Sequence, residues 1–224
     1  MAEVATILQI ILLGYCLGSI PFGVALAKLF RLPDPRYIGS GNIGATNMLR
    51  TGNKKVALLT LLLDAGKGAA AVLLTYYFFS ALEPNSVADC AAPNACWVRT
   101  LPTGLAALAI LAAAIGHMYS PLLKFKGGKG VATLFGGTLA FSWPVGMAAF
   151  FVWAIVMFVR RTVSLASIVA LAVAPLIAWL RVDGTSALIL AIAAGIAIWK
   201  HRENIKRLRK GFEPKISFGK GEIT

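Results

Sequence analysis

Long apolar segments with very few charges dominate this sequence. They cover roughly residues 4–30, 55–80, 101–119, 144–159, 163–180 and 185–200. A helix needs about 20 apolar residues to cross a bilayer, so these segments are candidate membrane spans. The chain is also 58% hydrophobic and only 14% charged, whereas soluble domains are about 45–50% apolar and about 25% charged. We therefore expect an all-α, polytopic integral membrane protein in which residues 1–224 form one domain.

The stretch between residues 129 and 160 decides how often the chain crosses the membrane. A helix over residues 131–142 would be only about 18 Å long, which is short for a hydrocarbon core of about 30 Å. If 129–142 and 144–159 are nevertheless separate spans, only Arg99 and Arg181 of the 22 basic residues lie opposite the others. If they form one kinked helix, the basic residues divide equally between the two sides.

Basic residues of membrane proteins concentrate on the cytoplasmic side. This bias favours seven transmembrane helices, with the N-terminus outside, the C-terminus cytoplasmic, and a fourth helix that is short, tilted or shielded by its neighbours. The loop of residues 82–99, which holds Cys90 and Cys96, then lies outside, and a disulfide between them is left open. The net charge of +13 follows from this flanking pattern. No recognised nucleic-acid motif accompanies it, so we expect membrane lipid and no nucleic acid as a partner.

A first glycine-rich run, GSGNIGATN, occupies residues 39–47 and is followed by Arg50. Glycine lets backbone N–H groups approach a ligand closely, and consecutive N–H groups beside a cation form a site for phosphate. The guanidinium of Arg50 is a planar fork that matches phosphate geometry. The alternative is a turn with capping residues, but three glycines and four polar side chains favour ligand binding. The candidates are Gly39, Ser40, Gly41, Asn42, Gly44, Thr46, Asn47 and Arg50.

A second run, KGGKG at residues 126–130, follows Gly116-His117 and leads into an apolar segment. Its two lysines flank a glycine pair at a predicted helix N-terminus, where the helix dipole favours an anion. It is not a Walker loop, because Gly130 stands where a serine or threonine is required. The candidates for binding phosphate are His117, Lys126, Gly127, Gly128, Lys129, Gly130 and Thr133.

Two further groups of charged residues are candidates. His201, Asn204 and Arg207 lie near Glu213 in the basic tail, which by itself would only indicate contact with lipid headgroups. Asp64 and Lys67 lie inside the second apolar segment, where charges are costly and usually paired or functional. Their i,i+3 spacing allows a mutual ion pair. An ion pair and a substrate contact through Lys67 both remain open.

The three motifs, in this order, closely resemble the PlsY-type bacterial acyl-phosphate-dependent glycerol-3-phosphate acyltransferases. The first run with Arg50, the KGGKGVAT segment and the series from His201 through Asn204 and Arg207 to Glu213 all match. The resemblance implies a multi-pass enzyme of the bacterial inner membrane whose active site faces the cytoplasm. It implies transfer of an acyl group from acyl phosphate to the 1-hydroxyl of sn-glycerol 3-phosphate, which gives lysophosphatidic acid and inorganic phosphate in phospholipid biosynthesis. No metal or cofactor is implied.

The reaction agrees with the residue chemistry, because both substrates carry phosphate and an acyl phosphate is already activated. We assign catalytic roles to Ser40, Lys129, His201 and Asn204, and substrate binding to the other candidates, including Lys67 and Arg207. Either His201 or the acyl phosphate's own oxygen accepts the hydroxyl proton, and the lack of an orienting carboxylate in the sequence slightly favours the substrate. Functional coupling to the enzyme that produces acyl phosphate is left open.

Two other classes of function remain at this stage. Seven spans and basic pockets also suit a transporter of organic phosphates. However, transporter sites usually lie near the bilayer midplane on broken helices, often with repeat symmetry, and here the glycine-rich runs lie at one face. A lipid-binding membrane protein would use the same loops only to hold headgroups.

Overall fold

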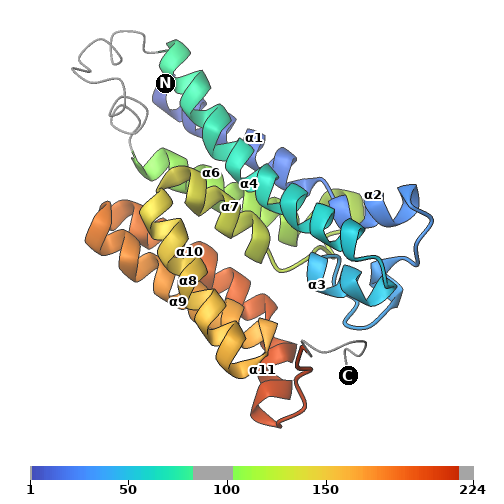
Figure 1. Ribbon diagram of the computed structural model, residues 1–224. Coiled ribbons are helices and arrows are strands. Elements are labelled where there is room, and N and C mark those ends of the chain that lie inside the picture. Colours follow the sequence, from blue (N-terminus) through green and yellow to red (C-terminus); the bar gives the residue numbers. More distant parts are fainter. Residues whose placement is uncertain (1, 83–102, 217–224) are drawn as a thin grey trace.

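The computed structural model describes residues 2–82 and 103–216, and within these ranges it contains helices and no β-strand (Figure 1). The expected all-α class is confirmed for this part of the chain. Cys90, Cys96 and Arg99 lie outside the described residues. The helices are α1 (Ala2–Ser19), α2 (Phe22–Leu29), α3 (Ala45–Met48), α4 (Lys54–Leu82), α6 (Thr103–Met118), α7 (Val131–Phe141), α8 (Trp143–Arg160), α9 (Val163–Arg181), α10 (Gly184–Lys200) and α11 (Arg202–Arg209).

Five of the expected spans are long and apolar enough to cross a membrane. They are Val4–Leu29, Lys54–Phe78, Thr103–Leu123, Trp143–Arg160 and Val163–Arg181. The helix α10 becomes a sixth only when it is joined to α11, from which it is bent by 60°. The apolar helix α7 is too short to be counted among these spans, because its 11 residues rise only about 16 Å. Seven spans and the orientation of the termini therefore stay predictions.

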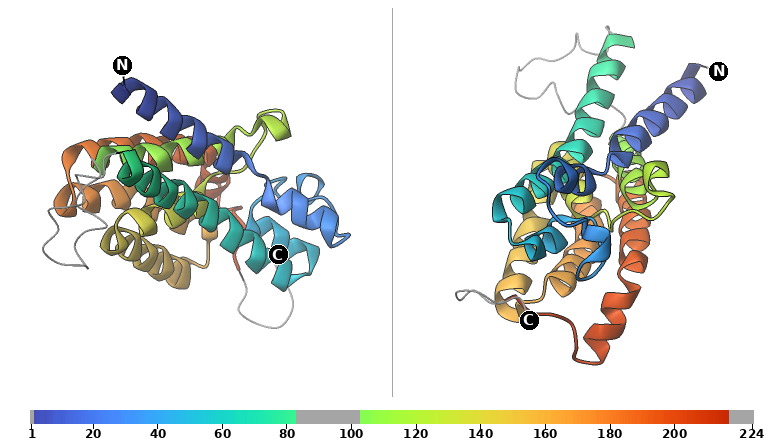
Figure 2. Two further views of the ribbon diagram at one scale, coloured as in Figure 1. Left: turned by 90° about the horizontal axis from the view of Figure 1, so that it is seen from above. Right: turned by 90° about the vertical axis from the view of Figure 1, so that its right-hand side faces the viewer.

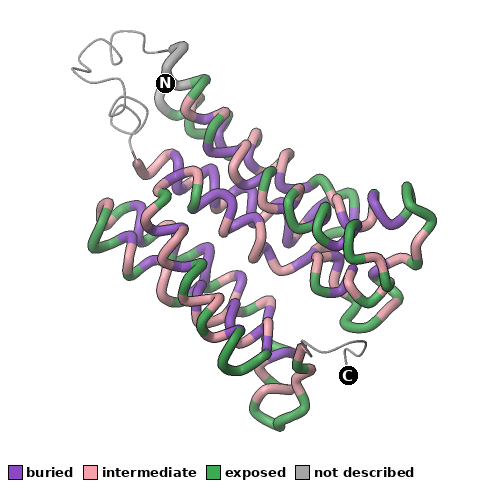
Figure 3. The backbone as a smooth tube through the Cα atoms, viewed as in Figure 1, coloured by how far each residue is buried: buried purple, intermediate pink, exposed green. Residues whose placement is uncertain are grey.

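The helices form two groups that meet along the length of the molecule (Figures 1 and 2). In the first group α1 packs on α6, and α4 packs on α7; in the second α8 and α10 flank α9. Contacts of α10 with α6 and of α7 with α8 join the groups. The shared core includes Ile110, Met118, Leu134 and Leu190. Figure 3 shows buried positions where helices face one another and exposed positions on the outside.

Large apolar side chains on the outer surface fit a lipid environment. Leu62 of α4, Phe158 of α8, Leu180 of α9 and Leu188 of α10 are all more than half exposed. Soluble monomeric proteins rarely expose so much contiguous apolar surface. The short helix α7 is instead packed between α4, α6 and α8, as expected for a short helix that neighbours shield. Its N-terminus at Val131 brings the second glycine-rich run to the end of the molecule where α3 and α11 lie.

Candidate active site

Two adjoining cavities, of ≈ 490 Å³ and ≈ 230 Å³, lie at this end of the molecule. We call them the large cavity and the small cavity. Both are lined by Ser40, Asn42, Lys129, Asn204 and Arg207. Since these residues come from all three sequence motifs, the fold brings together segments that are far apart in the chain. The shared residues mark the junction of the two cavities.

Nearly all predicted site residues line one of these cavities. Those that line the large cavity include Gly39, Gly44, Thr46, Asn47, Arg50, His117, Gly130 and His201, and those that line the small cavity include Gly41, Gly127 and Gly128. Three predicted residues line neither cavity. Thr133 is buried within α7, Lys126 is exposed, and Lys67 is buried among helices. Because these three residues line neither cavity, their predicted contact with substrate stays a prediction.

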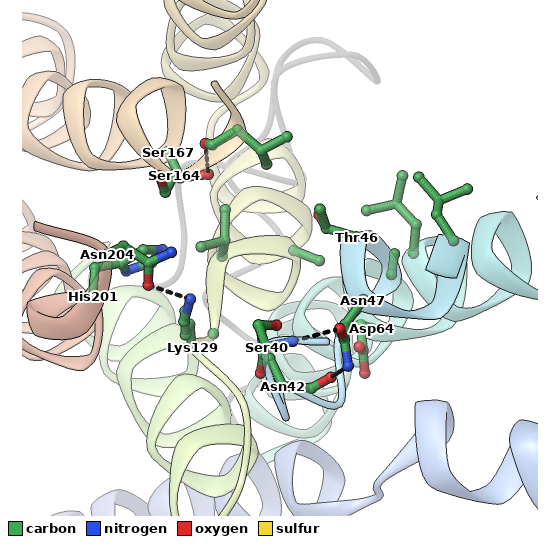
Figure 4. Close-up of a pocket in the computed structure, with 18 of the residues that line it drawn as sticks. Ser40, Asn42, Thr46, Asn47, Asp64, Lys129, Ser164, Ser167, His201 and Asn204 are labelled. Carbon is green, nitrogen blue, oxygen red and sulfur yellow. Dashed lines mark hydrogen bonds between the residues drawn. The ribbon is translucent and has the colours of Figure 1, made fainter. Parts of the chain in front are cut away.

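The side chain of Asn47 holds the first glycine-rich run together (Figure 4). Its Oδ1 accepts a hydrogen bond from the backbone N–H of Ser40 at 3.1 Å. Its Nδ2 donates to the carbonyl oxygens of Pro35, Ile38 and Asn42 at 2.7, 3.1 and 2.8 Å. These bonds occupy both the oxygen and the nitrogen of the side-chain amide, and Asn47 is only 2% exposed. The main role of Asn47 is therefore to shape the loop that presents Ser40.

The third motif joins the second through a chain of hydrogen bonds. Lys129 Nζ donates to Oδ1 of Asn204 at 2.5 Å, as Figure 4 shows. Asn204 Nδ2 donates to Oε1 of Glu213 at 2.6 Å, and Arg207 Nε donates to Oε2 at 2.7 Å. An ammonium only donates and a carboxylate only accepts, so these partners fix which way the Asn204 amide points. Glu213 thereby orients Asn204, and Asn204 aims Lys129 at the junction.

Burial lowers the pKa of Lys129 to about 8, against an opposing effect of the Glu213 carboxylate and with a further lowering by Arg207. If protonated Lys129 is the active form, activity falls above this pH. Glu213→Gln removes the charge that holds the pKa up, so the alkaline limb of the kcat/KM profile should move to lower pH. Glu203→Gln is the matched control, because Glu203 lines the small cavity but pairs with Lys206. An unmoved limb in Glu213→Gln would contradict this assignment.

His201 follows α10 and lines the large cavity. Its Nδ1 lies 2.8 Å from the carbonyl oxygen of Ala197. A carbonyl only accepts, so Nδ1 carries the proton and Nε2 of the neutral ring keeps its lone pair. Burial lowers the pKa of His201 to about 4, and the nearby Lys129 lowers it too. The ring is therefore neutral at physiological pH and can accept a hydrogen bond through Nε2.

The predicted ion pair between Asp64 and Lys67 is confirmed, and the structure adds a third member. Lys67 Nζ lies 3.0 Å from Oδ1 of Asp64 and 2.8 Å from Nδ1 of His117. It also donates to the carbonyl oxygen of Ile20 at 2.9 Å. We call Asp64, Lys67 and His117 the buried cluster. Asp64 and His117 reach the large cavity, whereas Lys67 does not.

Several lining residues were missed by sequence reasoning. One wall of the large cavity is apolar and contains Leu61, Ala65, Phe135, Phe150 and Trp153. These residues look like ordinary membrane-span positions in sequence, so no signal separates them. Lys200 and Arg202 line the small cavity. They flank His201 directly, and this adjacency is the signal that could have identified them.

The comparisons with known proteins agree with this geometry. A family model described as glycerol-3-phosphate acyltransferase matches residues 8–211. The chain belongs to the glycerol-3-phosphate acyltransferase family. A relative from Jannaschia sp. (strain CCS1), named glycerol-3-phosphate acyltransferase, is 48% identical over 205 residues, which are 92% of this chain and 90% of the relative. The relative of the same name from Rhodospirillum rubrum is 45% identical and is matched over 96% of each chain.

Two solved structures have the same fold. Crystal structures of PlsY (YgiH), an integral membrane glycerol 3-phosphate acyltransferase, match in a glycerol 3-phosphate form and a lysophosphatidic acid form. Their TM-scores are 0.78 and 0.75, with 34% and 33% identity. The matches cover 94% of this chain and 96% and 95% of the solved chains. This glycerol-3-phosphate acyltransferase family member is thus a multi-pass membrane protein and an acyltransferase, as the motifs predicted.

Proposed function

We propose that the protein transfers an acyl group from acyl phosphate to the 1-hydroxyl of sn-glycerol 3-phosphate. The hydroxyl oxygen forms an ester bond to the acyl carbon, and the bond from that carbon to the phosphate oxygen breaks. The products are lysophosphatidic acid and inorganic phosphate. The observation that carries the proposal is the junction at Lys129 and Asn204, where a small cavity of cationic character meets a cavity with an apolar wall.

The small cavity suits glycerol 3-phosphate. Its lining combines the backbone of Gly41, Gly127 and Gly128 with the cationic side chains of Lys200 and Arg202. The N–H groups of these three glycines already donate to carbonyl oxygens of the protein, so the cationic side chains are the groups that suit a phosphate dianion. The cavity is also small, and glycerol 3-phosphate is a small polar molecule without an apolar tail. This substrate would place its hydroxyl end toward the shared residues.

The large cavity suits the acyl phosphate. Its phosphate would lie among Ser40, Arg50 and Lys129, and its acyl chain would run along the apolar wall that includes Phe135 and Trp153. Phosphate leaves in the reaction, so the negative charge on its bridging oxygen grows as the bond breaks. A cation fixed beside that oxygen stabilises the transition state more than the ground state. We assign this role to Lys129.

The hydroxyl proton is best transferred to the leaving phosphate. A histidine whose pKa is about 4 is a weak base at neutral pH, because a base works best when its pKa lies near the working pH. Phosphate oxygens titrate near pH 6 and are the stronger acceptors. His201 would instead accept a hydrogen bond from the hydroxyl through Nε2 and orient it toward the acyl carbon. Substrate-assisted transfer is therefore the proposed route.

The site opens at the end of the molecule that holds the basic tail. Under the positive-inside bias this end faces the cytoplasm. Glycerol 3-phosphate, a water-soluble substrate, would then enter the site from the cytoplasm. We therefore propose a cytoplasm-facing active site in the bacterial inner membrane. Seven membrane crossings, with α7 as the short fourth, are part of this proposal.

The reaction is tested by phosphate release from palmitoyl phosphate, measured with protein purified in lipid, with and without sn-glycerol 3-phosphate. Release that needs both substrates, together with formation of lysophosphatidic acid, is the expected result. Release without glycerol 3-phosphate would indicate a hydrolase. Flux of glycerol 3-phosphate into liposomes without any release would favour a transporter and contradict the proposal.

The role of His201 is tested by two substitutions. His201→Gln can still accept a hydrogen bond but cannot take up a proton near neutral pH. It should retain at least about fivefold more turnover at saturating substrate than His201→Ala, since one oriented hydrogen bond is worth about 1 kcal/mol or more. Equal collapse of both variants with unchanged substrate binding would make His201 an essential base.

A further inference from the structure

The buried cluster has no part in the mechanism above. Asp64 and Lys67 lie on α4, and His117 lies in the last turn of α6. Their side chains are only 2–5% exposed. Lys67 Nζ joins α4 to the carbonyl oxygen of Ile20, between α1 and α2, and to the imidazole of His117. Charged groups are costly inside a membrane protein, so such a network calls for a function.

Two side chains of α4 hold one edge of the His117 ring. Nδ1 of His117 lies 2.8 Å from Lys67 Nζ and 3.6 Å from Oδ1 of Asp64. Lys67 Nζ in turn lies 3.0 Å from the same carboxylate oxygen. Lys67 thus helps to fix the orientation of a ring that belongs to another helix.

The opposite edge of that ring lies against the second glycine-rich loop. A Cβ on Gly128 would overlap Nε2 of His117, so the Cα of Gly128 lies directly on the imidazole. The backbone N–H groups of Gly127 and Gly128 donate to the carbonyl oxygens of Met118 and His117 at 3.2 and 3.1 Å. A Cβ on Gly127 would overlap this backbone instead of the ring. The two glycines are therefore held by two different surfaces.

We propose that Lys67 is a positioning residue for acyl transfer. Through the imidazole of His117 it sets the place of Gly128, and hence the backbone that lines the small cavity. Lys67 itself touches neither substrate. The inference rests on the proposed function, because it assigns the loop to the site for glycerol 3-phosphate.

The contact between ring and loop is tested by a double-mutant cycle on phosphate release. Gly128→Ala should lower kcat/KM at least about tenfold in the otherwise unchanged protein, because the added methyl overlaps a fixed ring. In the His117→Ala background the same change should cost less than about twofold, since the ring is gone. Gly127→Ala is the matched control and should be equally harmful in both backgrounds. Equal effects of Gly128→Ala in both backgrounds would overturn the proposal.

Lys67→Met tests the residue itself, since methionine has a similar length but no charge or donor. The KM for glycerol 3-phosphate should rise at least about tenfold while the KM for palmitoyl phosphate stays within about twofold. A merely structural role would reduce the amount of folded protein and leave both KM values unchanged, and that result would overturn the proposal. If unchanged protein releases phosphate only with both substrates, the proposed function stands whichever result Lys67→Met gives.

Discussion

Lys129→Ala should abolish most of the turnover while leaving the fold intact. Lys129 donates to Asn204 at the junction of the two cavities, and the proposed reaction develops negative charge on the phosphate at this point. Removing one preorganised group that stabilises such charge typically lowers kcat by about 10²–10³-fold. The loss should appear in phosphate release at saturating concentrations of both substrates. Folding can be checked by the thermal unfolding midpoint of the purified protein.

Lys126→Ala is the matched control for this prediction. Lys126 belongs to the same run and has the same charge, but it is exposed and lines neither cavity. We expect kcat within about threefold of the unchanged protein, because the charge of Lys126 lies outside both cavities and is screened by solvent. A loss in Lys126→Ala as large as that in Lys129→Ala would mean that both lysines reach the substrate phosphates, as the sequence alone predicted.

Asn47→Asp should unfold the first glycine-rich loop and destabilise the protein. The change replaces the Nδ2 donor by a carboxylate oxygen that faces the carbonyl oxygens of Pro35, Ile38 and Asn42. Asn47 is buried, and a buried charge that loses its compensation costs about 3–5 kcal/mol. The free energy of unfolding should fall by this amount. Activity should be lost together with stability.

Asn42→Asp makes the same chemical change in the same loop and separates the two roles. Asn42 is only half-buried and lines both cavities. Its new negative charge would repel the substrate phosphates, so the KM values should rise while the unfolding midpoint changes little. If Asn47→Asp instead raised the KM values and left the unfolding midpoint unchanged, Asn47 would be a substrate contact and not the centre of the loop.

Much of this protein follows directly from its sequence. Apolar segments of about 20 residues make a helical membrane protein unavoidable, because an unpaired backbone is too costly in lipid. The glycine-rich runs and the tail motif identify the family, and most of the site residues that they name line the two cavities. Local spacing also predicts the Asp64–Lys67 ion pair correctly, since residues three apart on a helix are neighbours.

Only the packing of the helices decides what each of these residues does. Lys67 and Lys129 look alike in the sequence, as lysines next to glycines. Packing places Lys67 among α1, α4 and α6 and leaves Lys129 at the junction of the cavities. Asn47 and Asn42 differ in the same way, because the fold surrounds one with backbone carbonyls and leaves the other facing open space. Such differences arise from contacts between residues distant in the chain, and local sequence does not contain them.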